Sequence, residues 1–216
     1  MIDWVFPPQP VGLPIEDSSH QFPVGRIFCV GQTYAEHARE MGSDPDRQPP
    51  FFFTKPPTAL TSGSTFVYPP GSQRVEHEVE LVLALGPGAE VVGHTLGLDM
   101  TRRDLQLEAK KLGRPWDPAK GFEGSAPCAP LRWRSTWPEQ GAIWLEVNGE
   151  RRQCGDLQQM IWKPREILQH LSCWFELRAG DLVFTGTPAG VGPVAVGDRL
   201  RAGIDGVGQL DIDVVQ

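Results

Sequence analysis

Hydrophobic and polar residues alternate in short runs over much of the chain, a pattern typical of half-buried β-strands. Residues 143–146 run into Asn148-Gly149, a dipeptide that tolerates the positive φ angles of a tight hairpin turn. Further alternating runs, separated by glycine-rich turns, lie at 181–184, 198–202 and 207–215. Strands therefore outnumber helices in the predicted fold.

Three segments show helical rather than strand spacing. Residues 164–175 begin with proline in the first turn and place apolar side chains on one side, which predicts a helix. A second helix is predicted after Asp99, because Thr101 and Asp104 have capping-box spacing and Gly113 can end it. A third, short helix follows an apolar run that ends at Gly31, and Gly42 can close it. The fold class is α+β and β-rich.

The domain organisation is expected to be simple. Residues 1–24 are rich in proline, glycine and polar side chains and are interpreted as an arm or small N-terminal piece, and 25–216 form one catalytic domain. No segment resembles a membrane span or a secretory signal, so a cytoplasmic protein is expected. The net charge of −7 argues against nucleic acid as the main partner. The basic pairs at 102–103, 110–111 and 151–152 are read as solvated faces.

Two carboxylates stand two residues apart in an otherwise apolar run at Glu78 and Glu80. In a strand their side chains share one face, with Cα atoms roughly 7 Å apart, so at an effective dielectric constant of about 20 they repel by roughly 2 to 3 kcal/mol. A divalent cation held by oxygens would reverse that energy, and Asp99 is the best candidate for a third ligand. A strand with a wet outer face explains the glutamates equally well from this run alone.

A second group of candidate residues lies on the predicted short helix. His37 and Glu40 are three residues apart, so both side chains project from one face. A carboxylate on one imidazole nitrogen fixes the tautomer and raises the basicity of the other nitrogen, as a general base requires. An ordinary surface pair is the alternative.

Five separated motifs, in order, resemble the fumarylacetoacetate hydrolase family over about residues 25 to 215. They are Cys29-Val30-Gly31 with 34–41, Phe53-Thr54-Lys55-Pro56, 77–81, 97–106 and Thr185-Gly186-Thr187-Pro188. Residues 109–122 are similar to the small acylpyruvate and fumarylpyruvate hydrolase branch. Gln32-Thr33, Glu76 and the short 86–93 connection depart from the family pattern.

The resemblance implies the fumarylacetoacetase C-terminal-like fold, a mixed β-roll with few helices, usually as a homodimer. It implies an Mg²⁺ or Mn²⁺ site from Glu78, Glu80 and Asp99, and a His37-Glu40 dyad that activates water. Lys120 would lie beside the substrate, and the following residues would hold its polar groups: Lys55, Arg103, Gln106 and Thr187.

The expected activity is hydrolysis of a carbon-carbon bond in a 3-acylpyruvate, a small 2-oxo acid, with fumarylpyruvate as the leading substrate and aromatic catabolism as the setting. The same site could instead decarboxylate or tautomerise a 2-oxo diacid such as oxaloacetate, because a pyruvate enolate is common to these reactions. A non-catalytic metal or metabolite-binding protein is a further alternative. The intact His37-Glu40 pair argues against it, since a binding protein needs no base.

Overall fold

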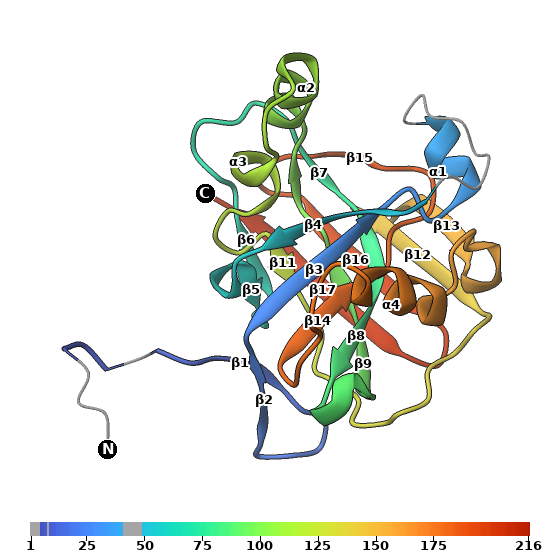
Figure 1. Ribbon diagram of the computed structural model, residues 1–216. Helices are drawn as coiled ribbons and strands as arrows, with labels where there is room; N and C mark the ends of the chain where they lie inside the picture. Colours follow the sequence, from blue (N-terminus) through green and yellow to red (C-terminus); the bar gives the residue numbers. More distant parts are fainter. Residues whose placement is uncertain (1–4, 8, 41–48) are drawn as a thin grey trace.

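Two five-stranded sheets form the body of the protein in the computed structural model, which describes residues 5–7, 9–40 and 49–216 (Figure 1). The first sheet contains, in spatial order, β4 (Phe51–Lys55), β3 (Arg26–Gly31), β14 (Asp181–Phe184), β8 (Val79–Leu85) and β9 (Val91–Leu98). The second contains β13 (Glu150–Asp156), β12 (Ala142–Val147), β16 (Arg199–Ile204), β17 (Gly208–Val215) and β6 (Thr65–Val67). The β-rich α+β class predicted from the sequence is confirmed.

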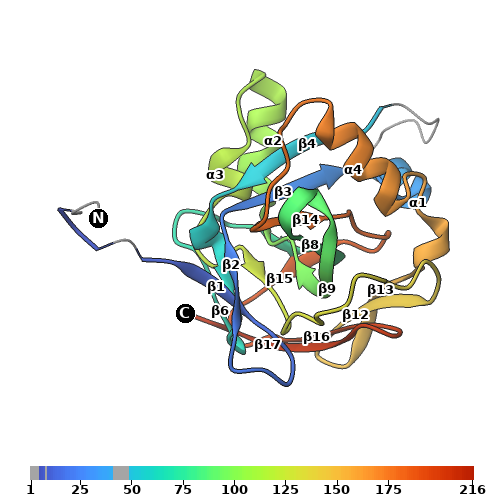
Figure 2. The same cartoon turned by 60° about the horizontal axis from the view of Figure 1, so that its bottom comes forward.

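Smaller strand groups and short helices surround these sheets. The strands are β1 (Val11–Pro14) with β2 (Gln21–Val24), β10 (Thr101–Arg102) with β7 (Val75–His77) and β15 (Gly192–Val194), and β11 (Ala126–Pro127) with β5 (Leu60–Thr61). The helices are α1 (Ala35–Glu40), α2 (Arg103–Leu112), α3 (Asp117–Lys120) and α4 (Pro164–Ser172), with single 3₁₀ turns at Pro57–Ala59, Pro87–Ala89 and Leu157–Gln159. Seen from below, α2, α3 and α4 lie over the first sheet, on the side away from β16 and β17 (Figure 2).

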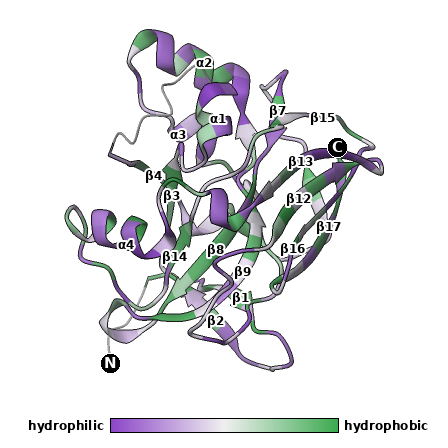
Figure 3. Ribbon diagram, turned by 90° about the vertical axis from the view of Figure 1, so that its right-hand side faces the viewer, coloured by the Kyte–Doolittle hydropathy of each residue, from purple (hydrophilic) through white to green (hydrophobic). Residues whose placement is uncertain are grey.

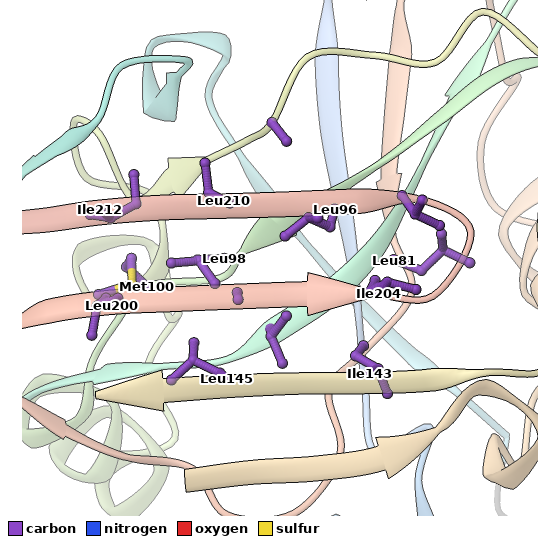
Figure 4. Packing of buried hydrophobic residues seen from close by; sticks show 14 of the residues in the cluster. Leu81, Leu96, Leu98, Met100, Ile143, Leu145, Leu200, Ile204, Leu210 and Ile212 are labelled. Carbon is purple, nitrogen blue, oxygen red and sulfur yellow. The ribbon is translucent and has the colours of Figure 1, made fainter. Parts of the chain in front are cut away.

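The main core lies between the two large sheets. Leu81 and Leu98 of the first sheet pack with Leu145, Leu200 and other apolar side chains of the second, and these residues are buried (Figure 4). Strand β8 is buried on both faces, which explains its nearly continuous apolar sequence (Figure 3). Along β16 and β17, buried apolar residues alternate with exposed polar ones over much of each strand, as their sequences predict.

The opposite face of the first sheet carries polar residues at one end. Because side chains alternate along a strand, Glu80 points away from the inter-sheet core that receives Leu81. The registers of the sheet place Phe51, Phe53 and Lys55 of β4 on the same face as Glu80. Glu80 pairs with Gly97 of β9, where a Cβ atom would lie 2.9 Å from Cys128 Sγ and from a Phe184 ring carbon, so only glycine fits beside these side chains. This end of the sheet therefore holds the candidate site.

Several predicted elements agree with the structure and others do not. The Asn148-Gly149 turn joins β12 and β13, with φ angles of 54° and 81°. Helix α4 starts at Pro164 as predicted but ends at Ser172 rather than at residue 175.

The predicted capping box on α2 is wrong. The N-cap residue is Arg102, whose side chain makes no capping hydrogen bond. Asp104 instead accepts hydrogen bonds from the Ser72 hydroxyl and the Gln73 N–H, each at 2.7 Å. The C-terminal signal is confirmed, because Gly113 has the left-handed conformation (φ 62°) that ends a helix. The helix start is thus fixed by a distant loop that local sequence cannot reveal.

The N-terminal piece packs against the first sheet through apolar side chains. Strands β1 and β2 form an antiparallel pair whose Leu13, Phe22 and Val24 join a second apolar cluster behind the first sheet, and the division into two parts stays a prediction. Gly42, predicted to close α1, lies outside the described residues. Within the described chain, no helix is both long and apolar enough to cross a membrane.

Leu145→Ala is expected to reduce the free energy of unfolding by about 2 to 5 kcal/mol, because Leu145 is fully buried between the sheets and truncation leaves a cavity. Leu107→Ala is the matched control, since Leu107 is 51% exposed on α2, and a change of about 0.5 kcal/mol or less is expected. Urea unfolding followed by circular dichroism measures both. Equal losses would contradict the assignment of the inter-sheet core.

Candidate active site

Three buried carboxylates converge at the polar end of the first sheet. Glu78 lies in the link between β7 and β8, Glu80 lies on β8, and Asp99 follows β9, with exposed fractions of 5%, 2% and 1%. One oxygen of each lies within 4.8 Å of the others. In the described part of the chain, no other set of three or more His, Cys, Asp or Glu residues brings its ligand atoms this close together. The wet-face alternative for Glu78 and Glu80 is therefore wrong, because both are buried.

Cationic side chains offset the charge of two of these carboxylates. The Lys120 Nζ atom lies 2.7 Å from Glu78 Oε2 and 2.7 Å from Asp99 Oδ2. Arg103 also donates to Glu78 through Nη2. Burial alone would raise the pKa of Glu78, but the Lys120 ammonium and the Arg103 guanidinium hold that pKa well below its usual value. Burial likewise opposes the charge of Lys120, yet Asp99 and Glu78 keep the pKa of Lys120 above its usual value.

Glu80 differs from its neighbours, because no cation of the described chain forms an ion pair with it. Its Oε2 accepts a hydrogen bond from the Gly186 N–H at 2.6 Å. Burial first, and then the charges of Asp99 and Glu78, raise the pKa of Glu80 well above its usual value. Glu80 is thus a buried carboxylate beside two others and without its own counter-ion. A bound hard cation would compensate its negative charge. The donor set therefore fits Mg²⁺ or Mn²⁺.

The His37 and Glu40 side chains of α1 form a pair at the same site. His37 Nδ1 lies 3.2 Å from Glu40 Oε2, and both Glu40 oxygens accept from the Gly190 N–H at 3.2 Å. His37 is 7% exposed and lines the pocket that contains the three carboxylates. This geometry leaves the Nε2 atom of His37 as the available ring nitrogen.

One pocket brings together most of the residues singled out from the sequence. It is lined by His37, Glu78, Glu80, Asp99, Arg103, Gln106, Lys120 and Thr187. Glu40 contacts the pocket through His37. Lys55 is not in its wall: the ammonium donates to Met100 O, Lys120 O and Ser125 Oγ, and lies 2.8 Å from Asp99 Oδ1. The position of Lys55 behind Asp99 thus differs from the substrate contact expected of it.

Arg103 is held in place by a network that includes Glu76. Its Nε donates to Glu76 Oε2, its Nη1 to Gln106 Oε1 and its Nη2 to Glu78. The second Glu76 oxygen accepts from Arg74 Nε at 2.7 Å. Glu76, one of the departures from the family pattern, therefore orients the guanidinium that neutralises Glu78.

Gln153 is a residue that the sequence did not indicate. It is fully buried on β13, accepts from the Val79 N–H at 3.1 Å, and lies 2.9 Å from His77 Nδ1 through the same oxygen. Its amide nitrogen donates to Thr187 Oγ1 at 2.7 Å. A single glutamine in a strand carries no sequence signal, so its role in fixing Thr187 is visible only in three dimensions.

The outer part of the pocket also contains residues that local sequence did not assign to it. Phe51, Phe53 and Trp116 line it, and so does Lys110, which is exposed, as the predicted solvated face requires, and also borders the pocket. Desolvation and the nearby Arg103 lower the pKa of Lys110. The i, i+4 spacing from Gln106 to Lys110 on α2 was the available signal, because such residues share a helix face.

Comparison with known proteins shows what the chain is similar to. Residues 26–215 match the model of the fumarylacetoacetate (FAA) hydrolase C-terminal family. The chain is 44% identical to a fumarylpyruvate hydrolase of a Ralstonia species over 76% of this chain and 92% of that protein. It is 39% identical to the oxaloacetate tautomerase YcgM of Escherichia coli, over 86% of this chain and 90% of that protein.

A similar crystal structure is that of fumarylpyruvate hydrolase from Pseudomonas aeruginosa in complex with Mn²⁺ and pyruvate. The TM-score is 0.95 at 48% identity, and 99% of each chain is covered. Fold and sequence thus agree over nearly the whole length. The chain belongs to the fumarylacetoacetate hydrolase family.

Proposed function

We propose that the protein is a divalent-metal-dependent hydrolase that cleaves the carbon-carbon bond of 3-acylpyruvates, with fumarylpyruvate as the leading substrate. The observation that carries the proposal is one pocket that contains three converging carboxylates, the base-competent His37 and the Lys120 ammonium. The similar fumarylpyruvate hydrolases of Ralstonia and Pseudomonas aeruginosa support the substrate class.

Glu78, Glu80 and Asp99 would hold the metal ion, Mg²⁺ or Mn²⁺, through oxygen ligands. When bound, the ion supplies a Lewis acid for the 2-oxo and carboxylate oxygens of the pyruvyl group. The crystal structure of the Pseudomonas aeruginosa hydrolase, in complex with Mn²⁺ and pyruvate, supports this assignment. Lys55 would then orient Asp99 rather than contact substrate, since it lies 2.8 Å from Asp99 Oδ1 and outside the pocket wall.

The side chains of the pocket divide the remaining chemistry among them. Glu40 holds the Nδ1 proton of His37, so His37 Nε2 can take a proton from water as that water adds to the acyl carbonyl. The carbon-carbon bond then breaks, the carboxylic acid forms, and the pyruvate enolate leaves and takes up a proton. The Lys120 ammonium would stabilise the developing negative charge, while Arg103, Gln106 and Thr187 position polar groups of the substrate.

Oxaloacetate tautomerisation is the second candidate, and the 39% identical Escherichia coli tautomerase supports it. That reaction needs proton transfer at carbon but no attacking water, so it could use the same carboxylates and His37. Cytoplasmic location, the homodimer and a place in aromatic catabolism stay predictions.

Asp99→Asn and Glu80→Gln are each expected to weaken Mn²⁺ binding at least about tenfold, because each removes a charged oxygen ligand from a set of three. Isothermal titration calorimetry or electron paramagnetic resonance with Mn²⁺ measures the affinity. Glu108→Gln serves as control, since Glu108 is an exposed acid on α2. Unchanged affinity in both site variants would remove the metal site from the proposal.

His37→Ala is expected to lower kcat for acylpyruvate hydrolysis by about 100-fold or more while Mn²⁺ affinity stays near that of the original protein, because only the base is lost. His20→Ala is the control, as His20 is exposed and contacts Ser18 far from the pocket. A His37→Ala protein with near-normal kcat would rule out the dyad.

The unaltered protein with Mg²⁺ or Mn²⁺ is expected to cleave acylpyruvates with a higher kcat/KM than that for oxaloacetate tautomerisation. Product identification by liquid chromatography and enol absorbance of oxaloacetate measure the two activities in parallel. A higher kcat/KM with oxaloacetate would replace the hydrolase proposal by the tautomerase. Activity on neither substrate would favour the non-catalytic binding protein.

A further inference from the structure

The two ends of the pocket differ in chemistry. The inner end holds Glu78, Glu80 and Asp99 with Lys120 against them. The outer end contains a second ammonium group, that of Lys110 on α2. A substrate whose pyruvyl group occupies the inner end would therefore extend its acyl group towards Lys110.

The helical spacing of α2 aims one row of residues at the pocket. Arg103, Gln106 and Lys110 follow one another at intervals of three and four, so they share a face of the helix, and all three line the pocket. Lys111 is the next residue, about 100° further round the helix; both lysines are exposed, but only Lys110 lines the pocket. Neighbouring lysines thus have different surroundings, which provides a matched pair for experiment.

An aromatic wall connects the inner and outer ammonium groups. The Trp116 ring lies 5.5 Å from the Phe51 ring and 5.7 Å from the Phe53 ring, measured between centroids. The Lys120 Nζ atom lies 5.0 Å from the Phe53 centroid, and the Lys110 Nζ atom lies 5.2 Å from the Trp116 centroid. The wall suits a flat, unsaturated chain between two charged ends, because such a chain can stack on aromatic rings.

Lys110 is the cation of this pocket whose charge is not already paired. Lys120 is bound to Glu78 and Asp99, and Arg103 to Glu76 and Glu78. Lys110 forms no ion pair with any residue that the structure describes, and its aromatic partner is Trp116. Its positive charge is therefore available to an anionic group of a ligand.

We propose that Lys110, together with the Trp116 ring, forms a subsite for a carboxylate at the far end of the substrate's acyl group. The protein thereby prefers acylpyruvates with a terminal carboxylate on an unsaturated acyl chain over acylpyruvates with a neutral acyl group. Oxaloacetate has two carbons between its carboxylates and fumarylpyruvate has five, so the distal carboxylate of oxaloacetate extends less far towards Lys110. This selectivity rests on the proposed hydrolase function and deepens it.

The test compares Lys110→Met with Lys111→Met on two substrates, fumarylpyruvate and acetylpyruvate, which share the scissile bond but differ in the distal carboxylate. Methionine keeps an aliphatic stem over Trp116 and removes the charge. Lys110→Met is expected to lower kcat/KM for fumarylpyruvate by about 10- to 100-fold, mainly through KM, as expected when a hydrogen bond to a charged group is lost. For acetylpyruvate the change is expected to stay within about twofold, and Lys111→Met to change neither.

Lys110→Arg is expected to recover most of the fumarylpyruvate activity, because it restores the positive charge. Equal losses on both substrates, or no loss on either, would overturn the subsite. The original protein's cleavage of acetylpyruvate reports on the hydrolase function separately, since that substrate needs no distal subsite. If it cleaves neither substrate, calorimetric titration of the Mn²⁺-loaded protein with fumarate decides: equal affinity in the original and Lys110→Met proteins overturns the subsite, and affinity at least tenfold weaker in the variant supports it.

Discussion

The burial of three carboxylates at one point is the constraint on which the rest of the structure depends. Oxygens of Glu78, Glu80 and Asp99 lie within 4.8 Å of one another, so at an effective dielectric constant of about 20 each pair of charges repels by roughly 3 to 4 kcal/mol. Lys55, Lys120 and Arg103, which come from three different elements, offset this repulsion. Each of these cations is itself nearly inaccessible to solvent. The buried carboxylates and the buried cations therefore stabilise one another in their charged forms.

The fold supplies these groups from distant parts of the chain. Glu80 comes from β8, an inner strand of the first sheet, Lys55 from its edge strand β4, and Lys120 from α3. The large core between the sheets packs against one face of β8, and the other face carries Glu80 at 2% exposure. A loss of packing between the sheets would therefore also disturb the distances in the pocket.

The sequence predicted those features whose cause is local. Asn148-Gly149 carries its own turn preference, Pro164 starts a helix and Gly113 ends one, and the β-rich class follows from alternation. The spacing of His37 and Glu40 predicted a pair that the structure has at 3.2 Å. The acidic cluster could be predicted only in part from the sequence. The spacing places Glu78 and Glu80 near each other but does not indicate which residues surround them.

Features that depend on tertiary contacts were not readable in the same way. Asp104 binds the loop at Ser72 and Gln73 instead of capping its own helix, and Lys55 turns to Asp99 rather than to the pocket. Gln153 reaches Thr187 across 34 residues of sequence, and no pattern along β13 marks it. In each case the partner lies far away in sequence, so no local pattern indicates it.

Gly186 illustrates how little freedom the pocket leaves to some backbone positions. Its φ is 93°, a Cβ atom there would lie 1.9 Å from Thr33 Oγ1, and its N–H is the hydrogen-bond donor to Glu80. Replacement by any other amino acid would at once strain the main chain, collide with a buried hydroxyl and shift that donor. For protein engineering, a library that randomises the pocket to change its substrate should keep this codon fixed and vary the aromatic wall instead.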